Sequence, residues 1–152
     1  MIRWWMVRPV VGSVFGWVAL FAAALLMVAS AAIHIHLWQI AYRHVATLGP
    51  LFLVQAVAAL VGAVVLALLR WAVVAIGCAV LMLGTVVGFV LADTVGIFGF
   101  TLPVVTSWAY ESLIAEVLAS VILVFLVVRS WLQDRAESRQ DGASKPVGVA
   151  RV

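Results

Sequence analysis

The chain has 152 residues, of which 67% are hydrophobic and 10% are charged, and its mean hydropathy is +1.27. A soluble domain is nearer half apolar and a quarter charged, and a body of this size cannot enclose so much apolar surface. The net charge of +3 comes from cations scattered at the ends of apolar runs, without the basic run and interleaved aromatics of a nucleic-acid footprint. The composition therefore excludes an ordinary soluble domain, argues against nucleic acid as a partner, and predicts a lipid bilayer as the solvent.

Four apolar runs follow one another along the chain. A membrane-spanning helix needs about 20 apolar residues, because each adds about 1.5 Å of rise across a hydrocarbon layer of about 30 Å. The runs predict spans over residues 10–33, 51–69, 71–92 and 107–128. We therefore expect residues 1–131 to form one all-α domain, a transmembrane four-helix bundle.

The second and third runs are separated only by Arg70. One continuous helix over 51–92 would be about 63 Å long, about twice the hydrocarbon thickness. We therefore expect the chain to turn at Arg70 in a tight hairpin. After the fourth run, residues 132–152 alternate in charge and have little to bury, which predicts a cytoplasmic tail that is disordered beyond its first turn or two.

The cations indicate an orientation. With four spans, Arg70 and all basic residues before the first span and after the fourth face one side, and Arg43 alone faces the other. The positive-inside rule then places both termini in the cytoplasm, and aromatic residues at the predicted interfaces, such as Trp71 and Trp108, agree. The Arg-, Ala- and Val-rich composition is typical of a GC-rich genome, so we expect a bacterial plasma membrane.

The first run has a second interpretation. Arg3 and Arg8 before it and Ala29-Ser30-Ala31 at its end have the order of a cleaved signal peptide, but the run exceeds the usual length of about 7–15 residues, which favours an uncleaved anchor. Cleavage would leave three spans and the same orientation for the rest.

Small residues recur at helical spacing within each run. In lipid, helices associate through close backbone approach and polar contacts, so these stripes predict buried helix faces. The glycines expected at helix contacts are Gly12, Gly16, Gly62, Gly77, Gly84 and Gly88. Cys78 is the one cysteine of the chain, so no internal disulfide forms, and we expect it to be a small packing residue.

One carboxyl group lies deep in a span: Glu116 is about 12 Å along its helix from Trp108. A charged carboxylate at that depth is costly unless it is paired, hydrated or protonated. Ser112 and Ser120 lie one turn away on the same face, and Gln55, at a similar depth, is the expected partner. The group is either a proton- or ligand-handling acid or a protonated packing residue hydrogen-bonded across helices, and we favour the second interpretation.

The histidines define a second candidate site. His34, His36 and His44 lie at or beyond the end of the first span, and the topology brings Asp93 and Glu111 to the same side. Imidazole and carboxylate ligands suit zinc or copper. On a helix, however, the first two rings point about 160° apart, so both reach one ion only from an extended segment. Ordinary interfacial histidines are therefore favoured over a metal or redox site.

The connection between the third and fourth spans, Asp93–Pro103, is unusually apolar. Gly96, Gly99 and Pro103 argue against a regular helix through it. It either folds back into the outer leaflet and caps the bundle above Gln55 and Glu116, or rests at the lipid interface, which we favour.

Several stretches carry a family resemblance: His34-Ile-His-Leu-Trp, Tyr42-Arg-His, Leu48-Gly-Pro-Leu-Phe-Leu and Gly96-Ile-Phe-Gly-Phe. They resemble small uncharacterised four-span integral membrane proteins of high-GC bacteria, a resemblance that implies no activity. The sequence contains no nucleotide-binding glycine loop, Ser or Cys catalytic motif or zinc-protease motif. We therefore expect no enzyme activity and no cofactor.

Three functional hypotheses follow. The leading one is a non-enzymatic packing or interaction subunit, either a homo-oligomer or part of a larger membrane assembly. The first alternative is a small-molecule or proton-handling membrane protein that uses Glu116 and Gln55. The second alternative is the metal or redox site on the outer face.

Overall fold

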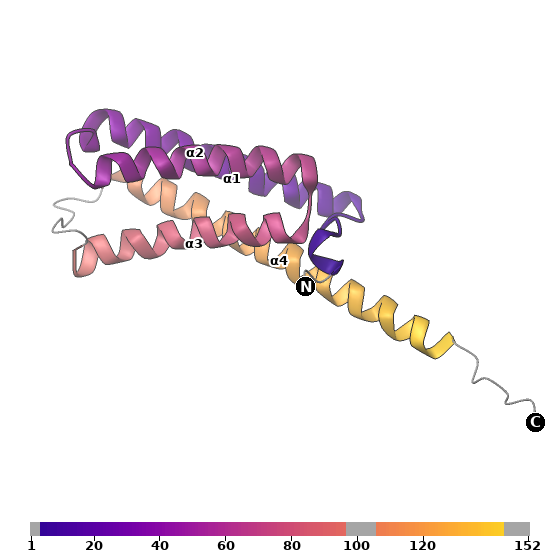
Figure 1. Ribbon diagram of the computed structural model, residues 1–152. Coiled ribbons are helices and arrows are strands. Elements are labelled where there is room, and N and C mark those ends of the chain that lie inside the picture. Colours follow the sequence, from indigo (N-terminus) through magenta and orange to yellow (C-terminus); the bar gives the residue numbers. More distant parts are fainter. Residues whose placement is uncertain (1–3, 97–105, 145–152) are drawn as a thin grey trace, which may run out of the picture.

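The computed structural model describes residues 4–96 and 106–144. In chain order these form a short 3-10 helix η1 (Trp4–Val7), helix α1 (Val14–Leu37), a π-helical turn η2 (Trp38–Tyr42), and helices α2 (Leu48–Leu69), α3 (Ala72–Thr94) and α4 (Ser107–Ser144). The helices run up and down as a bundle, with η1 and the α2–α3 turn at one end and η2 at the other (Figure 1). We call these the Arg70 end and the η2 end. The predicted all-α four-helix bundle is confirmed.

The outside of the bundle is apolar. All four α-helices are long and apolar enough to cross a membrane, and large side chains such as Phe15, Leu25, Val54, Val80 and Val121 are each more than half exposed. Water would make such a surface unfavourable, whereas hydrocarbon is as apolar as the side chains themselves. The chain is therefore a multi-pass membrane protein that presents this surface to lipid.

The first helix begins four residues later than the predicted span. Ser13 is its N-cap, with an extended backbone and a side chain that accepts a hydrogen bond from the Gly16 amide at 3.2 Å. The residues before this cap pair with the α2–α3 turn instead, since Pro9 bridges Trp71 and the Val10 amide donates to the Arg70 carbonyl at 2.8 Å. The predicted start at residue 10 is therefore wrong, because the apolar run includes a strand-like segment before the cap.

The tight hairpin at Arg70 is confirmed. Helix α2 ends at Leu69, Arg70 adopts a left-handed conformation with φ 56°, and α3 begins at Ala72. This conformation reverses the chain with only Arg70 and Trp71 between the helix ends. At the opposite end of α2 a glycine is required, because a Cβ on Gly49 would lie 2.7 Å from the carbonyl oxygen of Tyr42 in η2.

Helix α4 begins at the predicted Ser107 but continues to Ser144. Residues 132–144 extend the helix away from the bundle (Figure 1), so the disorder expected beyond the first turn or two of the tail is wrong as far as residue 144. Arg8 anchors this extension, donating to Glu137 at 2.6 Å and lying 3.4 Å from Asp134. Residues 97–105 and 145–152 lie outside the described residues, so the predictions for the apolar connection and the end of the tail stay predictions.

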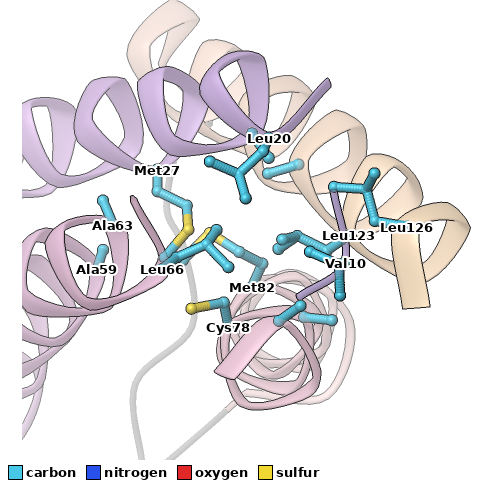
Figure 2. Close-up of a cluster of buried hydrophobic side chains, with 14 of the residues drawn as sticks. Val10, Leu20, Met27, Ala59, Ala63, Leu66, Cys78, Met82, Leu123 and Leu126 are labelled. Carbon is cyan, nitrogen blue, oxygen red and sulfur yellow. The ribbon is translucent and has the colours of Figure 1, made fainter. Parts of the chain in front are cut away.

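The apolar core occupies the half of the bundle nearer the Arg70 end. Leu20, Leu66, Met82, Leu123 and Leu126 come from all four helices and are fully buried. Figure 2 shows their side chains converging, with the Met27 and Met82 thioethers between the helices. Small residues on α2 and α3 allow this close approach, among them Ala59, Ala63, Ala72, Ala75 and Ala79.

The predicted glycine contacts divide into two groups. Gly62 faces Met27 and Cys78, whose atoms would lie 3.0 and 3.2 Å from an added Cβ, and a Cβ on Gly16 would lie 3.3 Å from the Val11 backbone. Cys78 is buried against this contact, as expected of a packing residue. By contrast, an added Cβ would meet nothing within 4 Å, in the part of the chain that the structure describes, at four positions: Gly12, Gly77, Gly84 and Gly88. Contact with another helix of this chain is therefore the wrong prediction for those four.

Candidate functional site

The buried acid in the η2 half is held by hydroxyl groups. Ser30 of α1 and Ser112 of α4 donate to the same oxygen of Glu116, Oε1, at 2.8 and 2.9 Å. The Nδ1 atom of His34 lies 3.7 Å from that oxygen. All four side chains are buried, with 2% of Glu116 exposed. The cluster joins α1 to α4 by polar contacts, which are a main source of helix association in lipid.

The His34 ring has one assignable proton. Its Nδ1 lies 2.9 Å from the backbone carbonyl oxygen of Ser30, and a carbonyl oxygen can only accept, so Nδ1 carries a hydrogen. In the neutral ring Nε2 is then an acceptor. The ring is held in place by Phe52 of α2, at a centroid distance of 5.1 Å.

The geometry differs from that of a hydrolase triad. In a triad the imidazole accepts the serine proton at one nitrogen and donates to the acid from the other. Here Ser30 and Ser112 donate directly to Glu116, while His34 Nδ1 donates to a backbone carbonyl. The His34 Nδ1 atom lies 3.4 Å from both serine hydroxyls but carries its own hydrogen, so the described residues do not form the Ser–His–acid order of a triad.

The cluster follows from two matched spacings. On α1, Ser30 and His34 are four residues apart, and on α4 Ser112 and Glu116 have the same spacing, so each pair occupies one helix face. Sequence reasoning missed Ser30 as a member of this site. The signal was available, because a polar i,i+4 pair on each of two spans at a similar depth favours contact between them.

Two predicted relations within the site differ from the structure. The direct partner of Glu116 is not Gln55, because its carboxyl group accepts from the serines instead. Ser120 is buried on the same face, but its hydroxyl donates to the backbone carbonyl of Glu116 at 2.7 Å and does not bond the carboxyl group. Gln55 and Glu116 are nevertheless neighbours in a wider sense, because both line the same cavity.

That cavity lies between α2, α3 and α4 and has a volume of about 440 Å³. Its walls are mostly apolar, with polar side chains from each surrounding helix. Two of its wall residues, Val54 of α2 and Val80 of α3, are more than half exposed, so its mouth opens sideways between these helices. The volume and the mostly apolar lining of this cavity are those of a site that binds a small molecule. Its lining includes His34, Leu51, Gln55, Gly84, Thr85, Gly88, Ser112 and Glu116.

Gln55 lines the cavity, but its Nε2 atom has almost no accessible surface and no hydrogen-bond partner among the described residues. Leaving a buried amide donor unpaired costs about 1–3 kcal/mol, so such groups are rare in folded proteins. The unpaired donor therefore belongs to the interior behind the wall, and other atoms of Gln55 face the cavity.

The α3 wall is shaped by two glycines. Gly84 and Gly88 line the cavity, and a Cβ on either would meet no atom within 4 Å. The absence of side chains here leaves the space that forms the cavity. The GxxxG pair was expected to bring another helix close, and in this chain it borders open volume instead.

The five candidate metal ligands are dispersed. Among the described residues no group of three or more His, Cys, Asp or Glu side chains is placed to hold an ion. His34 faces Glu116, whereas the His36 ring lies tilted against Trp108 at a centroid distance of 4.9 Å and His44 accepts from the Arg43 guanidinium at 2.8 Å. Asp93 and Glu111 are exposed at the ends of α3 and α4. The helical spacing separates the first two rings, as the sequence indicated.

The comparisons with known proteins add no family: no family model matches the chain, and neither a curated protein nor a solved structure matches it. The function must therefore be argued from the site itself.

Proposed function

We propose that this membrane protein binds a small lipid-soluble molecule in the cavity between α2 and α3, with Gln55 and Glu116 among its polar contacts. The observation that carries the proposal is the cavity itself, which is largely apolar, opens on the lipid-facing side of the bundle, and is lined in part by Gln55 and Glu116. A molecule dissolved in the hydrocarbon layer would enter between the two helices without crossing water.

The cavity can be filled without disturbing the bundle. A leucine at Gly84 has open space around its Cβ and would occupy the cavity, whereas a leucine at Gly77, on the same helix, also has open space but lies outside the cavity. The two variants gain the same helix-forming side chain, so Gly77→Leu is the matched control.

The test uses an apolar alkyl diazirine as photolabel on the full chain in phosphatidylcholine nanodiscs, with labelled peptides identified by mass spectrometry. We expect concentrated labelling on residues of the cavity wall, loss of that labelling in Gly84→Leu, and retention in Gly77→Leu. Even labelling of all lipid-facing residues, unchanged by Gly84→Leu, would refute a binding cavity.

We also propose that the Arg70 end faces the cytoplasm of a bacterial cell, with both termini inside. Arg8, Arg70, Arg129 and Arg135 lie at or beyond this end, whereas Arg43 lies at the η2 end, which supports this orientation by the positive-inside rule. Reporter fusions after Arg139 test it: alkaline phosphatase should be inactive and a fluorescent protein bright. The reverse pattern would refute the orientation.

The role as a packing or interaction subunit stays a prediction. The glycines with open space around them, above all Gly77 on the exposed face of α3, would allow another helix to approach. Sedimentation of the detergent-solubilised protein tests this role, and a strict monomer with no co-purifying partner would count against it.

A further inference from the structure

The charge of the bound molecule follows from the hydrogen-bonding groups of the cavity wall, and this inference rests on the function proposed above. Two hydroxyl groups of the wall already donate within the protein. Ser112 donates to Glu116 Oε1 at 2.9 Å, and Thr85 donates to the carbonyl oxygen of Leu81 at 3.0 Å. Tyr42, at the η2 end of the wall, also has a partner within the chain. The hydroxyl hydrogens beside Glu116 are therefore not available to a bound molecule.

The nitrogen donors beside Glu116 are not available either. His34 donates from Nδ1 to the Ser30 carbonyl, and Nε2 of the neutral ring carries no hydrogen. Gln55 has amide hydrogens, but its Nε2 atom has almost no accessible surface. This part of the wall therefore offers hydrogen-bond acceptors to a bound molecule and no donor.

The strongest of these acceptors is the second oxygen of Glu116. Ser30 and Ser112 both donate to Oε1, and the same oxygen is the one that lies 3.7 Å from His34 Nδ1. Oε2 bonds none of the described residues and, unlike Gln55 Nε2, is not sealed from the surface. The described residues of the wall include neither lysine nor arginine. Glu116 therefore presents an unpaired carboxyl oxygen to a cavity without a basic side chain.

These groups discriminate between head groups. A carboxylate or phosphate head would bury a negative charge beside Glu116 with neither a cation nor a spare donor to pair it. A hydroxyl head could donate to Oε2, but its own oxygen would find no available donor there. An ammonium head has donors and no acceptor, so all of its hydrogen-bonding groups can be satisfied by acceptors of the wall.

Charge favours the ammonium head as well. A carboxylate or an ammonium group alone is costly within the hydrocarbon layer, and pairing the two offsets part of both costs. Phe89 of α3 also lines the cavity, and an aromatic ring attracts a cation. We propose that the cavity between α2 and α3 binds an apolar amine in its protonated form, with the ammonium group beside Oε2 of Glu116.

The experiment is a competition against the apolar photolabel, on the full chain in the same phosphatidylcholine nanodiscs. Three competitors share one alkyl chain and differ in head group: dodecylammonium, dodecanol and dodecanoate, each compared at its measured mole fraction in the bilayer. We expect dodecylammonium to displace the label from the cavity wall at a roughly tenfold lower mole fraction than dodecanol, the difference expected from about one hydrogen bond to a charged group. Dodecanoate should be the weakest competitor.

Two variants of α4 assign the preference to one carboxyl group. Glu116→Gln keeps the size of the side chain and removes its charge, so it should take up the photolabel as wild type does but lose the tenfold preference for dodecylammonium. Glu111→Gln removes a charge at an exposed position outside the cavity wall, and it should leave the preference unchanged. If Glu116→Gln fails to fold, the order of the three competitors on the wild-type protein still decides the charge of the ligand.

Several outcomes would overturn the inference. Equal displacement by dodecylammonium and dodecanol would mean that a proton or His34 already neutralises Glu116, and strongest displacement by dodecanol or dodecanoate would mean a neutral or anionic ligand. A preference that survives in Glu116→Gln would place the ammonium group elsewhere. Each of these results would leave the proposed binding function standing, whereas the absence of concentrated labelling on the cavity wall would refute both proposals.

Discussion

The two halves of the bundle contain the same kinds of small residue, but one half is closely packed and the other contains a cavity. Near the Arg70 end, small residues on α2 and α3 bring the helices together around Leu20, Leu66 and Leu123. Near the η2 end, the glycines of α3 border a cavity, and the buried contacts between α1 and α4 are made by Ser30, Ser112 and Glu116. A small residue therefore permits close approach but does not enforce it. Whether a neighbouring side chain fills the space decides between a contact and a cavity.

The largest expected difference between the halves is in the free energy of unfolding that is lost when one leucine of each half is replaced by alanine. Leu66 is fully buried in the core, whereas Leu51 lines the cavity and is 43% exposed. We expect Leu66→Ala to lower the free energy of unfolding by about 2–4 kcal/mol, because it leaves a void, and Leu51→Ala to lower it by less than about 1 kcal/mol. Reversible unfolding in mixed detergent micelles measures both. Equal losses would contradict the division into a packed and an open half.

The same two halves can be compared by adding a side chain at a glycine in each, instead of removing one. We expect Gly62→Leu to destabilise the protein by about 1–3 kcal/mol, because the new side chain meets Met27 and Cys78 at contact distance. Gly84→Leu, with open space, should cost nothing measurable. Thermal denaturation in detergent compares the two, and a similar loss in Gly84→Leu would mean that α3 already packs tightly there.

The polar contacts of the η2 half can be tested by a double-mutant cycle. Ser30→Ala with Glu116→Leu should show a coupling energy of about 0.6–1.7 kcal/mol, from the average to the largest value for hydrogen bonds between transmembrane helices. Ser120→Ala with Glu116→Leu is the control, since Ser120 bonds only the Glu116 backbone, and its coupling should be near zero. Equal coupling in the two cycles would argue against a bond from Ser30 to the carboxyl group.

The smallest effect is expected beyond the Arg70 end. Arg8 and Glu137 have side chains that are 51% and 61% exposed, and exposed ion pairs contribute about 0–1 kcal/mol. Glu137→Gln should therefore change the stability of the bundle by less than about 1 kcal/mol, and the difference should shrink further in high salt. A larger, salt-independent loss would show that the α4 extension is part of the stable core.

The sequence predicted the architecture well, because span length is fixed by the thickness of the hydrocarbon layer and the hairpin at Arg70 follows from length alone. The start of α1 was missed, because apolar composition cannot distinguish a helix from the short strand-like segment before Ser13. The sequence identified the buried polar residues more readily than it identified their hydrogen-bond partners. Depth along a helix can be counted from the sequence, which correctly indicated a similar level for Gln55 and Glu116. The rotation of each helix about its axis cannot be read from the sequence. That rotation turns Glu116 toward Ser30 and places His34 in the same cluster.

The most direct test of the central claim, that the η2 half is open to a lipid-borne molecule, is a nuclear Overhauser measurement on the methyl group of Thr85, which lines the cavity. The protein would be studied in deuterated bicelles containing a protonated lipid-soluble probe, dodecane. The account predicts cross-peaks from this methyl group to dodecane, lost in Gly84→Leu. Cross-peaks from Thr85 to α2 side chains alone, unchanged by dodecane, would show that α2 and α3 are closed upon each other and would contradict it.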